Sequence, residues 1–243
     1  MRRYISDLNL EIGKTVEIDG ELFKHVVVVC RNQSGDQFEL LVDDLAYLVE
    51  LTTVNKKAAQ VQVLEKRKIP DLPKPYIHLV LSNPKVQVLE SVVEKSVELG
   101  VKSIFLLVTE NSFFKSASKL KQKEKRLEKI ISQALQQTNR HERLTVHGPM
   151  ALGDFLEVFE SMPEKAGWLM YEKAPLSQKF GEVDQGLQSV CLLVGPEGGF
   201  TEPEVKLANS YGFKSISLGS QILRVETACV AGVSILKSKL QTW

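Results

Sequence analysis

From residue 76 onward, short apolar segments alternate with amphipathic ones, and this alternation restricts the possible folds more than any other feature. The apolar runs YIHLVLS, SIFLLV and VCLLV are typical of strands that are covered on both faces. After the first run, Leu89, Val92, Val93 and Val97 recur at helical spacing until Gly100. We therefore expect an α/β fold, with a mostly parallel sheet and helices on both of its faces.

The rest of this region predicts further elements of the same kind. We expect helices at 119–138 and 151–160, strands at 103–108, 167–171 and 190–194, and a final helix, strand and helix from residue 202 onward. The Lys-rich stretch 115–130 fits the solvated face of a helix, because Glu124 and Glu128 alternate with its lysines.

The first 70 residues follow a different pattern. Short segments rich in β-branched residues alternate with turn signals: VEI, HVVVVC, DQFELLV, AYLVELTTV and AAQVQVLEKR. Pro70, Pro73 and Pro75 follow and favour a stiff, extended connector. We expect a small β-barrel or curled sheet here, with a domain boundary near 70–75.

Composition and spacing exclude several classes of function. The net charge is +1, so charge alone indicates no polyanionic partner. Cys30, Cys191 and Cys229 form no CxxC pair, and the 4 histidines lack metal-ligand spacing, so we expect neither disulfides nor a metal. Because no apolar run has the length of a membrane span or resembles a signal-peptide core, we expect no membrane contact and a cytoplasmic location.

A Gly-rich turn, GPEGGF, directly follows the apolar run 190–194. Ligands of open α/β sheets bind at the carboxyl ends of strands, and Thr201 with Glu204 forms a capping box that starts the next helix. The turn lacks the spacing of a P-loop or a dinucleotide site, and Glu197 would repel a phosphate. A nucleoside without phosphate, or with positive charge, would tolerate this acid, and a purely structural turn is the alternative.

A second dense stretch, SLGSQILRVETACVAGVSIL, spans 217–236. A strand ends before it and a helix is predicted to begin near Val225, so Arg224, Glu226 and Thr227 gather where the helix starts. One interpretation is that Glu226 complements the helix dipole and pairs with Arg224. The other is that this segment and the Gly-rich turn form two walls of one pocket.

At these residues the chain resembles a known family. GPEGGFTEPE, followed about 20 residues later by LGSQILRVETA, is similar to the signature of the bacterial small-subunit ribosomal RNA uridine-N3 methyltransferases of the SPOUT superfamily. The resemblance extends through VVEKSVELGVKSIFLLVTENS, QALQQTNR and, near the N-terminus, MRRY, His25 and VVCRNQSGD. The chain departs from the family's pattern at Asn111, where Arg is usual, and at Gln133, where an acid is usual.

The resemblance implies a fold, an activity and partners. The fold is a knotted SPOUT-type sheet with a C-terminal trefoil knot in residues 73–243, plus a small PUA-like, RNA-binding β-barrel in residues 1–72. The activity is methylation at N3 of a specific uridine in 16S ribosomal RNA of the small ribosomal subunit, with S-adenosylmethionine as cofactor. Family members are homodimers, and the apolar stripe that ends in Leu240 and Trp243 suits burial against a second copy, although it would equally suit packing within one chain.

The resemblance also implies which residues surround the cofactor. They are Val194, Gly195, Pro196, Glu197, Gly198 and Gly199 from the first motif, and Leu218, Gly219, Ile222, Leu223, Arg224 and Thr227 from the second. Residues 170–172, after another predicted strand, are candidates for a third wall.

Roles in catalysis and RNA binding follow in the same way. Arg224 would stabilise the developing uracil anion, and Glu226 or Glu197 would orient the base or accept its proton. The candidates for contacts with RNA phosphates are Arg2, Arg3, Arg31 and Arg140. Two alternatives stay open: a related SPOUT RNA methyltransferase with another target, or a non-catalytic module for RNA binding or ribosome assembly.

Overall fold

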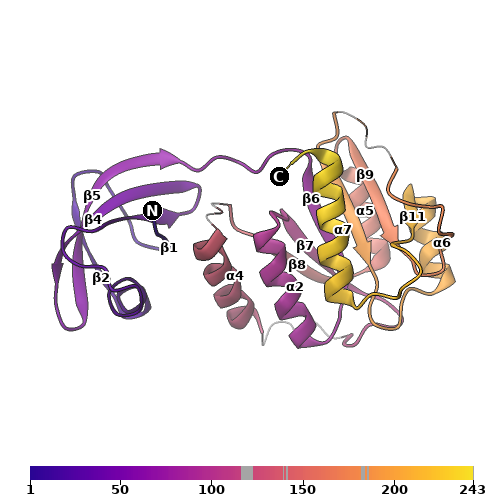
Figure 1. Ribbon diagram of the computed structural model, residues 1–243, viewed down its shortest axis with the longest axis horizontal. Coiled ribbons are helices and arrows are strands. Elements are labelled where there is room, and N and C mark those ends of the chain that lie inside the picture. Colours follow the sequence, from indigo (N-terminus) through magenta and orange to yellow (C-terminus); the bar gives the residue numbers. More distant parts are fainter. Residues whose placement is uncertain (116–122, 139, 141, 182–183, 185, 243) are drawn as a thin grey trace. The chain divides into compact units, whose positions relative to one another are not determined.

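The computed structural model describes all residues except 116–122, 139, 141, 182–183, 185 and 243. The described chain divides into two compact units, and each carries its own sheet (Figure 1). The first unit comprises Met1–Asp71 and Leu135–Glu142, and the second comprises Leu72–Ala134 and Arg143–Trp243.

The N-terminal unit is built on a five-stranded mixed sheet in the order β1, β3, β4, β5, β2. The strands are β1 (Arg3–Ile5), β2 (Thr15–Asp19), β3 (Gln37–Val42), β4 (Leu45–Val54) and β5 (Ala58–Lys68). β1 pairs with β3 in parallel, and the other pairs are antiparallel. Alternate residues such as Phe38, Leu40, Val49 and Val61 face one apolar core, as the period of a strand requires.

The predicted strand HVVVVC is wrong. This region forms a short helix α1 (Gly20–Phe23) that continues into a π-helix, η1 (Lys24–Val29). Phe23 and Val26 lie three residues apart and are buried in the core, whereas Val28 and Val29 are 61% and 66% exposed. Packing of one helical face therefore overrides the β propensity of the valines.

The second unit is built on a six-stranded sheet in the order β11, β9, β10, β6, β7, β8. The strands are β6 (Tyr76–Ser82), β7 (Ser103–Val108), β8 (Thr145–Ala151), β9 (Lys165–Met170), β10 (Ser189–Val194) and β11 (Phe213–Ile216). Every neighbouring pair is parallel, which confirms the expected α/β class. The edge strand β8 was not expected, because Gly148 and Pro149 interrupt its apolar pattern.

Helices cover both faces of this sheet, as expected. They are α2 (Val86–Glu98), α4 (Glu124–Thr138), α5 (Leu152–Ser161), α6 (Glu202–Ser210) and α7 (Val225–Leu240). α2 and α7 lie side by side on one face, and α5 lies on the other (Figure 1). On the α5 face, Phe155 and Phe159 pack into one core cluster with Leu169 and Leu193.

Three parts of the expected fold stay predictions: the trefoil knot, the closure of the N-terminal sheet into a PUA-like barrel, and residues 119–122 of the predicted helix 119–138, which lie outside the described residues. Trp243, predicted to end the apolar stripe, is also outside them. Within the described chain, α7 buries one apolar stripe, Val225, Cys229, Gly232, Val233 and Leu236, and Leu240 near its end is half-buried.

The described residues include no helix long and apolar enough to cross a membrane, and no group of three or more His, Cys, Asp or Glu that could hold a metal. Cys191 and Cys229 are buried, and this burial raises the pKa of both thiols. Cys30 is only half-buried, at the end of η1.

Candidate active site

Four parallel strands end level with one another, and this register defines the candidate site. Val194 at the end of β10 lies opposite Met170 of β9 and Leu81 of β6. Ile216 at the end of β11 also lies opposite Met170. The loops that follow β9, β10 and β11 therefore leave the sheet side by side, at the edge where α/β proteins bind ligands.

Glycine is required in the turn after β10. Gly199 has φ +70°, and its backbone N–H donates to the carbonyl of Pro196 at 2.9 Å. A Cβ at Gly199 would also come within 3.0 Å of a carboxylate oxygen of Glu172, just after β9. The turn thus packs closely against residue 172, which belongs to the segment 170–172 that was expected to form a third wall.

Asn111 holds this turn from the end of β7. Its side-chain amide donates to the carbonyl oxygens of both Gly198 and Gly199, each at 3.1 Å. A Cβ at Gly198 would come within 3.0 Å of the Asn111 Cβ. From the sequence, Asn111 was named only as a departure from the family pattern, and no role in this turn was assigned to it. The one feature of the sequence that indicates such a role is its position just after a predicted strand.

The helix α6 starts as predicted. The backbone N–H and the hydroxyl of Thr201 donate to Glu204 Oε2 at 2.9 and 3.1 Å, which confirms the Glu204 half of the capping box. The other carboxylate oxygen of Glu204 accepts from the backbone N–H of Glu110 at 2.8 Å. Glu204 therefore joins the start of α6 to the end of β7.

Glu197 lies exposed on the rim of the turn. Its carboxylate accepts a hydrogen bond from the backbone N–H of Lys85 at 3.4 Å. Lys85 is the N-cap residue of α2, so the positive end of that helix dipole favours the negative charge of Glu197. The Lys85 ammonium lies 5.8 Å from the centroid of the Phe113 ring.

The loop after β11 presents apolar surface. Ile222 is 86% exposed and Leu223 is 36% exposed, whereas Leu218 is half-buried. Gly219 has φ +133°, and its N–H donates to the hydroxyl of Ser217 at 3.2 Å. The loop thus exposes most of one large apolar side chain, Ile222, and part of a second, Leu223, a feature of ligand and partner sites.

The polar residues that follow do not neutralise one another. Arg224 is the exposed N-cap residue of α7, and Glu226 lies half-buried in the first turn. Among the residues that the structure describes, Arg224 forms no ion pair with Glu226, so the pairing considered from the sequence is not observed. Thr227 is exposed beside them. The guanidinium is therefore available to a ligand.

Close packing at Gly232 fixes α7 on the sheet. A Cβ at this position would come within 2.7 Å of Leu192 Cδ2 and 2.9 Å of Met170 Sδ. Helices that follow a parallel strand run back along the sheet from its carboxyl edge. The start of α7 at Val225 therefore belongs to the same edge as the Gly-rich turn.

Two of the predicted RNA contacts lie exposed in the N-terminal unit. Arg2 donates to the carbonyl of Cys30 and, at 3.4 Å, to the side-chain oxygen of Asn32. Arg31 lies between these two acceptors in the sequence and is exposed, with φ 56°. Arg2 and Arg31 thus belong to one local group of cations.

The other two predicted RNA contacts are largely buried. Arg3 binds the carboxylate of Glu39, and its side chain is 15% exposed. Arg140 is 8% exposed, and burial lowers its pKa to about 10, which still leaves it charged at neutral pH. Neither position was recognisable as buried from the sequence.

This site defines a ligand-binding α/β domain, because its glycine-rich and polar loops gather at the carboxyl edge of a parallel sheet. Residues 70–237 match the family model of the RNA methyltransferase domain. Over 226 residues the chain is 31% identical to ribosomal RNA small subunit methyltransferase E of Mesomycoplasma hyopneumoniae, across 93% of this chain and 89% of that relative. The chain belongs to the ribosomal RNA small subunit methyltransferase E family.

Two solved structures extend this relation to the fold. A ribosomal RNA small subunit methyltransferase E from Neisseria gonorrhoeae, bound to S-adenosyl methionine, is 27% identical with a TM-score of 0.83 and covers 98% of this chain and 97% of its own. A putative methyltransferase from Legionella pneumophila, in complex with the same cofactor, is 28% identical with a TM-score of 0.84 and covers 97% and 96%. S-adenosylmethionine is thus bound in two homologues that share the whole fold.

Proposed function

We propose that this chain is an S-adenosylmethionine-dependent methyltransferase of small-subunit ribosomal RNA. The observation that carries the proposal is the common register of β9, β10 and β11, which brings the Gly-rich turn and the loop 217–227 to one edge of the sheet. The names of the family's members and the cofactor in two related structures support it.

The residues at this edge fit such a cofactor. The turn contains Glu197 and no Lys or Arg, so it suits a ligand that lacks phosphate and carries a positive sulfonium. Ile222 and Leu223 offer apolar cover for an adenine ring, and backbone groups of Leu218 and Leu223 would bind its edge. The residues that we propose to surround the cofactor are Val194, Gly195, Pro196, Glu197, Gly198, Gly199, Leu218, Gly219, Ile222, Leu223, Arg224 and Thr227, of which Arg224 faces the methyl acceptor.

We propose N3 of a uridine as the methylated atom. The bound cofactor supplies an electrophilic methyl group, and the chain must hold N3 in line with it, take up the N3 proton and stabilise the anion on the flanking carbonyl oxygens. Arg224, exposed and unpaired with Glu226, would bind those oxygens. Glu226 or Glu197 would accept the proton as a carboxylate.

We assign RNA binding to residues 1–72, as a PUA-like domain, and catalysis to residues 73–243, as a SPOUT domain whose chain forms the trefoil knot. Arg2 and Arg31 are our first candidates for phosphate contacts because both are exposed. Arg3 and Arg140 remain candidates, with Arg3 bound to Glu39.

We further propose that the protein acts as a homodimer in the cytoplasm. The exposed side chain of Ile235 on α7 adds to an apolar helix that would suit burial against a second copy. The molar mass in solution at micromolar concentration, from light scattering, distinguishes this state from a monomer of 27.2 kDa.

The test is incubation of the purified protein with methyl-labelled S-adenosylmethionine and small ribosomal subunits from cells that lack the enzyme. Nucleoside analysis by mass spectrometry should find the label in 3-methyluridine. Label in another nucleoside would replace the target with that of a related SPOUT enzyme. Cofactor binding without any transfer would favour a non-catalytic RNA-binding or assembly module.

A further inference from the structure

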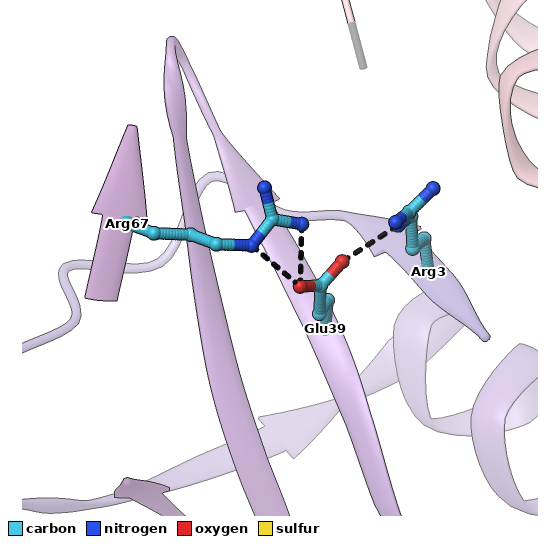
Figure 2. Close-up of polar contacts among 3 residues, drawn as sticks. All are labelled: Arg3, Glu39 and Arg67. Atoms are coloured by element: carbon cyan, nitrogen blue, oxygen red, sulfur yellow. Dashed lines mark hydrogen bonds and ion pairs between the residues drawn. The ribbon is translucent and has the colours of Figure 1, made fainter. Parts of the chain in front are cut away.

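A buried carboxylate joins three strands of the N-terminal sheet (Figure 2). Glu39 of β3 accepts a hydrogen bond from Arg3 Nε of β1, at 2.6 Å on Oε2. Its Oε1 accepts from Arg67 of β5, at 3.0 Å from Nε and 2.6 Å from Nη2. Arg67 thus meets the carboxylate with two N–H groups of its planar fork, which fixes the orientation of the guanidinium.

The sequence makes this reach across the sheet possible. β4 lies between β3 and β5, and its residue Ala46 is in register with Leu41 on one side and Arg67 on the other. The methyl side chain of Ala46 leaves room for the Arg67 side chain to pass over β4 toward Glu39. The neighbouring core residues Phe38 and Leu40 point to the opposite face, because side chains alternate along a strand.

The carboxylate of this cluster stays ionised. Burial alone would raise the pKa of Glu39, but the hydrogen bonds and charges of Arg3 and Arg67 outweigh this effect and hold that pKa below its usual value. Glu39 is therefore ionised at neutral pH, and it pairs with both guanidinium groups.

Arg67 is the member of the cluster that solvent reaches. Its side chain is 43% exposed, compared with 15% for Arg3 and 9% for Glu39. Its Nη1 group points away from Glu39 in Figure 2, and within the described chain no acceptor binds it. Lys66 and Lys68, on either side of Arg67, are also exposed, so β5 ends in three exposed cations.

We propose that Glu39 is a positioning residue that presents the outer N–H edge of Arg67 to a phosphate of the ribosomal RNA substrate. This inference rests on the proposed function, because it takes that RNA as the ligand. A guanidinium held by a carboxylate has less side-chain freedom to lose when a phosphate binds. The exposed positive charges of Lys66, Arg67 and Lys68 attract the phosphate, as Lys and Arg do in RNA-backbone recognition.

Two other roles for Glu39 predict different results. If it only ties β1, β3 and β5 together, its loss lowers stability and leaves the RNA affinity of the folded protein unchanged. If it acts only through its charge, Glu39→Gln makes the surface more positive and strengthens RNA binding. A positioning role predicts that Glu39→Gln weakens RNA binding, because Arg67 then lacks the carboxylate that holds its guanidinium in place.

The experiment measures steady-state methylation by the full-length protein, with unmodified small ribosomal subunits as the varied substrate. Arg67→Ala should raise KM for the subunits about 10-fold, leave kcat and cofactor affinity within about 2-fold, and reduce the salt dependence of binding by about one ion. Glu39→Gln should raise KM about 3-fold. The double variant should be no worse than Arg67→Ala alone, because Glu39 acts through Arg67.

Lys57→Ala is the matched control. Lys57 is exposed at the other end of β5, about 30 Å from Arg67, and its loss changes the net charge equally. The inference is overturned if Arg67→Ala and Lys57→Ala have equal effects, if Glu39→Gln lowers KM or leaves it unchanged, or if the two RNA effects add in the double variant. An inactive wild-type protein would instead refute the proposed function, before any variant is compared. Thermal unfolding of each variant gives the fraction of folded protein at the assay temperature, and the kinetic constants are corrected for that fraction.

Discussion

Asn111 and the glycines that it holds determine the shape of the candidate cofactor turn. One amide group binds two successive carbonyls of a segment that lies far from it in the sequence. The same carbonyls belong to Gly198 and Gly199, where a side chain would collide with Asn111 or Glu172. A short amide side chain thus does the anchoring at a position where the family usually has a longer cation.

Removing this anchor should loosen the turn. Asn111→Ala loses two neutral hydrogen bonds, about 1–2 kcal/mol in total, so we expect the affinity for S-adenosylmethionine to fall roughly 5- to 30-fold. Titration calorimetry measures this change directly. Asn9→Ala, at an exposed position of the N-terminal unit, is the control and should leave the affinity unchanged. An unchanged affinity in Asn111→Ala would show that the turn keeps its shape without the amide.

Arg224 should separate chemistry from cofactor binding. We expect Arg224→Ala to lower the single-turnover rate of methyl transfer at least about 100-fold, because a donor to the developing anion is lost. Cofactor affinity should change less than about 3-fold. The exposed Lys206 of α6 provides the control, Lys206→Ala. Loss of cofactor binding together with transfer would identify Arg224 as a residue that builds the pocket.

Among the elements, α7 is the one that links the sheet to the candidate site. Its start at Val225 and its buried stripe were predicted correctly, because Gly232, Cys229 and Leu236 recur at helical spacing along one side. The close approach at Gly232 lets the helix lie against β9 and β10. The position of Arg224 therefore depends on how closely a distant part of the same helix packs.

Gly232→Ala tests this packing. The added methyl must displace Leu192 and Met170, so we expect a loss of about 1–3 kcal/mol in the free energy of unfolding, measured by chemical denaturation. Gly153→Ala is the matched control, because nothing lies within 4 Å of a Cβ at that helical position. It should be neutral or slightly stabilising. Equal effects of both substitutions would mean that α7 does not pack as closely as described.

Elements with a single repeating signal could be predicted from the sequence, and contacts between distant elements could not. The parallel strands other than β8, and the helices α2, α6 and α7, follow from apolar runs, helical spacing and a capping box. HVVVVC was misread because its valines have β propensity, while its helical form depends on Phe23 and Val26 reaching a core made by other strands. The Asn111 contact requires β6 to lie between β7 and β10, which no local pattern reveals.

At the scale of the whole molecule, we expect a histidine at the opposite edge of the parallel sheet to make the stability of the fold depend on pH. His78 on β6 binds the hydroxyl of Ser103 at 2.7 Å. Phe105 lies between His78 and His147, with ring centroids at 6.0 and 4.6 Å. Burial, then the charges of Lys102 and His147, lower the pKa of His78 from 6.5 to about 4. The folded protein therefore keeps this ring neutral.

Acid should destabilise the fold through this residue. In the unfolded chain the His78 ring takes up a proton below pH 6.5, but in the folded protein it does so only near pH 4. The free energy of unfolding is therefore highest above pH 6.5 and falls as the pH drops below that value. From pH 7 to pH 5, the free energy of unfolding of the wild type should fall by about 2 kcal/mol more than that of His78→Asn, because asparagine has no group that takes up a proton. Urea denaturation at both pH values measures this difference. Parallel losses in the two proteins would assign the acid sensitivity to other groups.

The strand order also has a consequence for synthesis of the chain. β6 is completed early and pairs on one side with β7, but its other neighbour is β10, made more than a hundred residues later. At about 5–20 residues per second, the backbone groups on that side of β6 wait roughly 5–20 s for their partner. During translation this unit therefore exposes an unpaired apolar strand edge, the surface that chaperones protect and that drives aggregation.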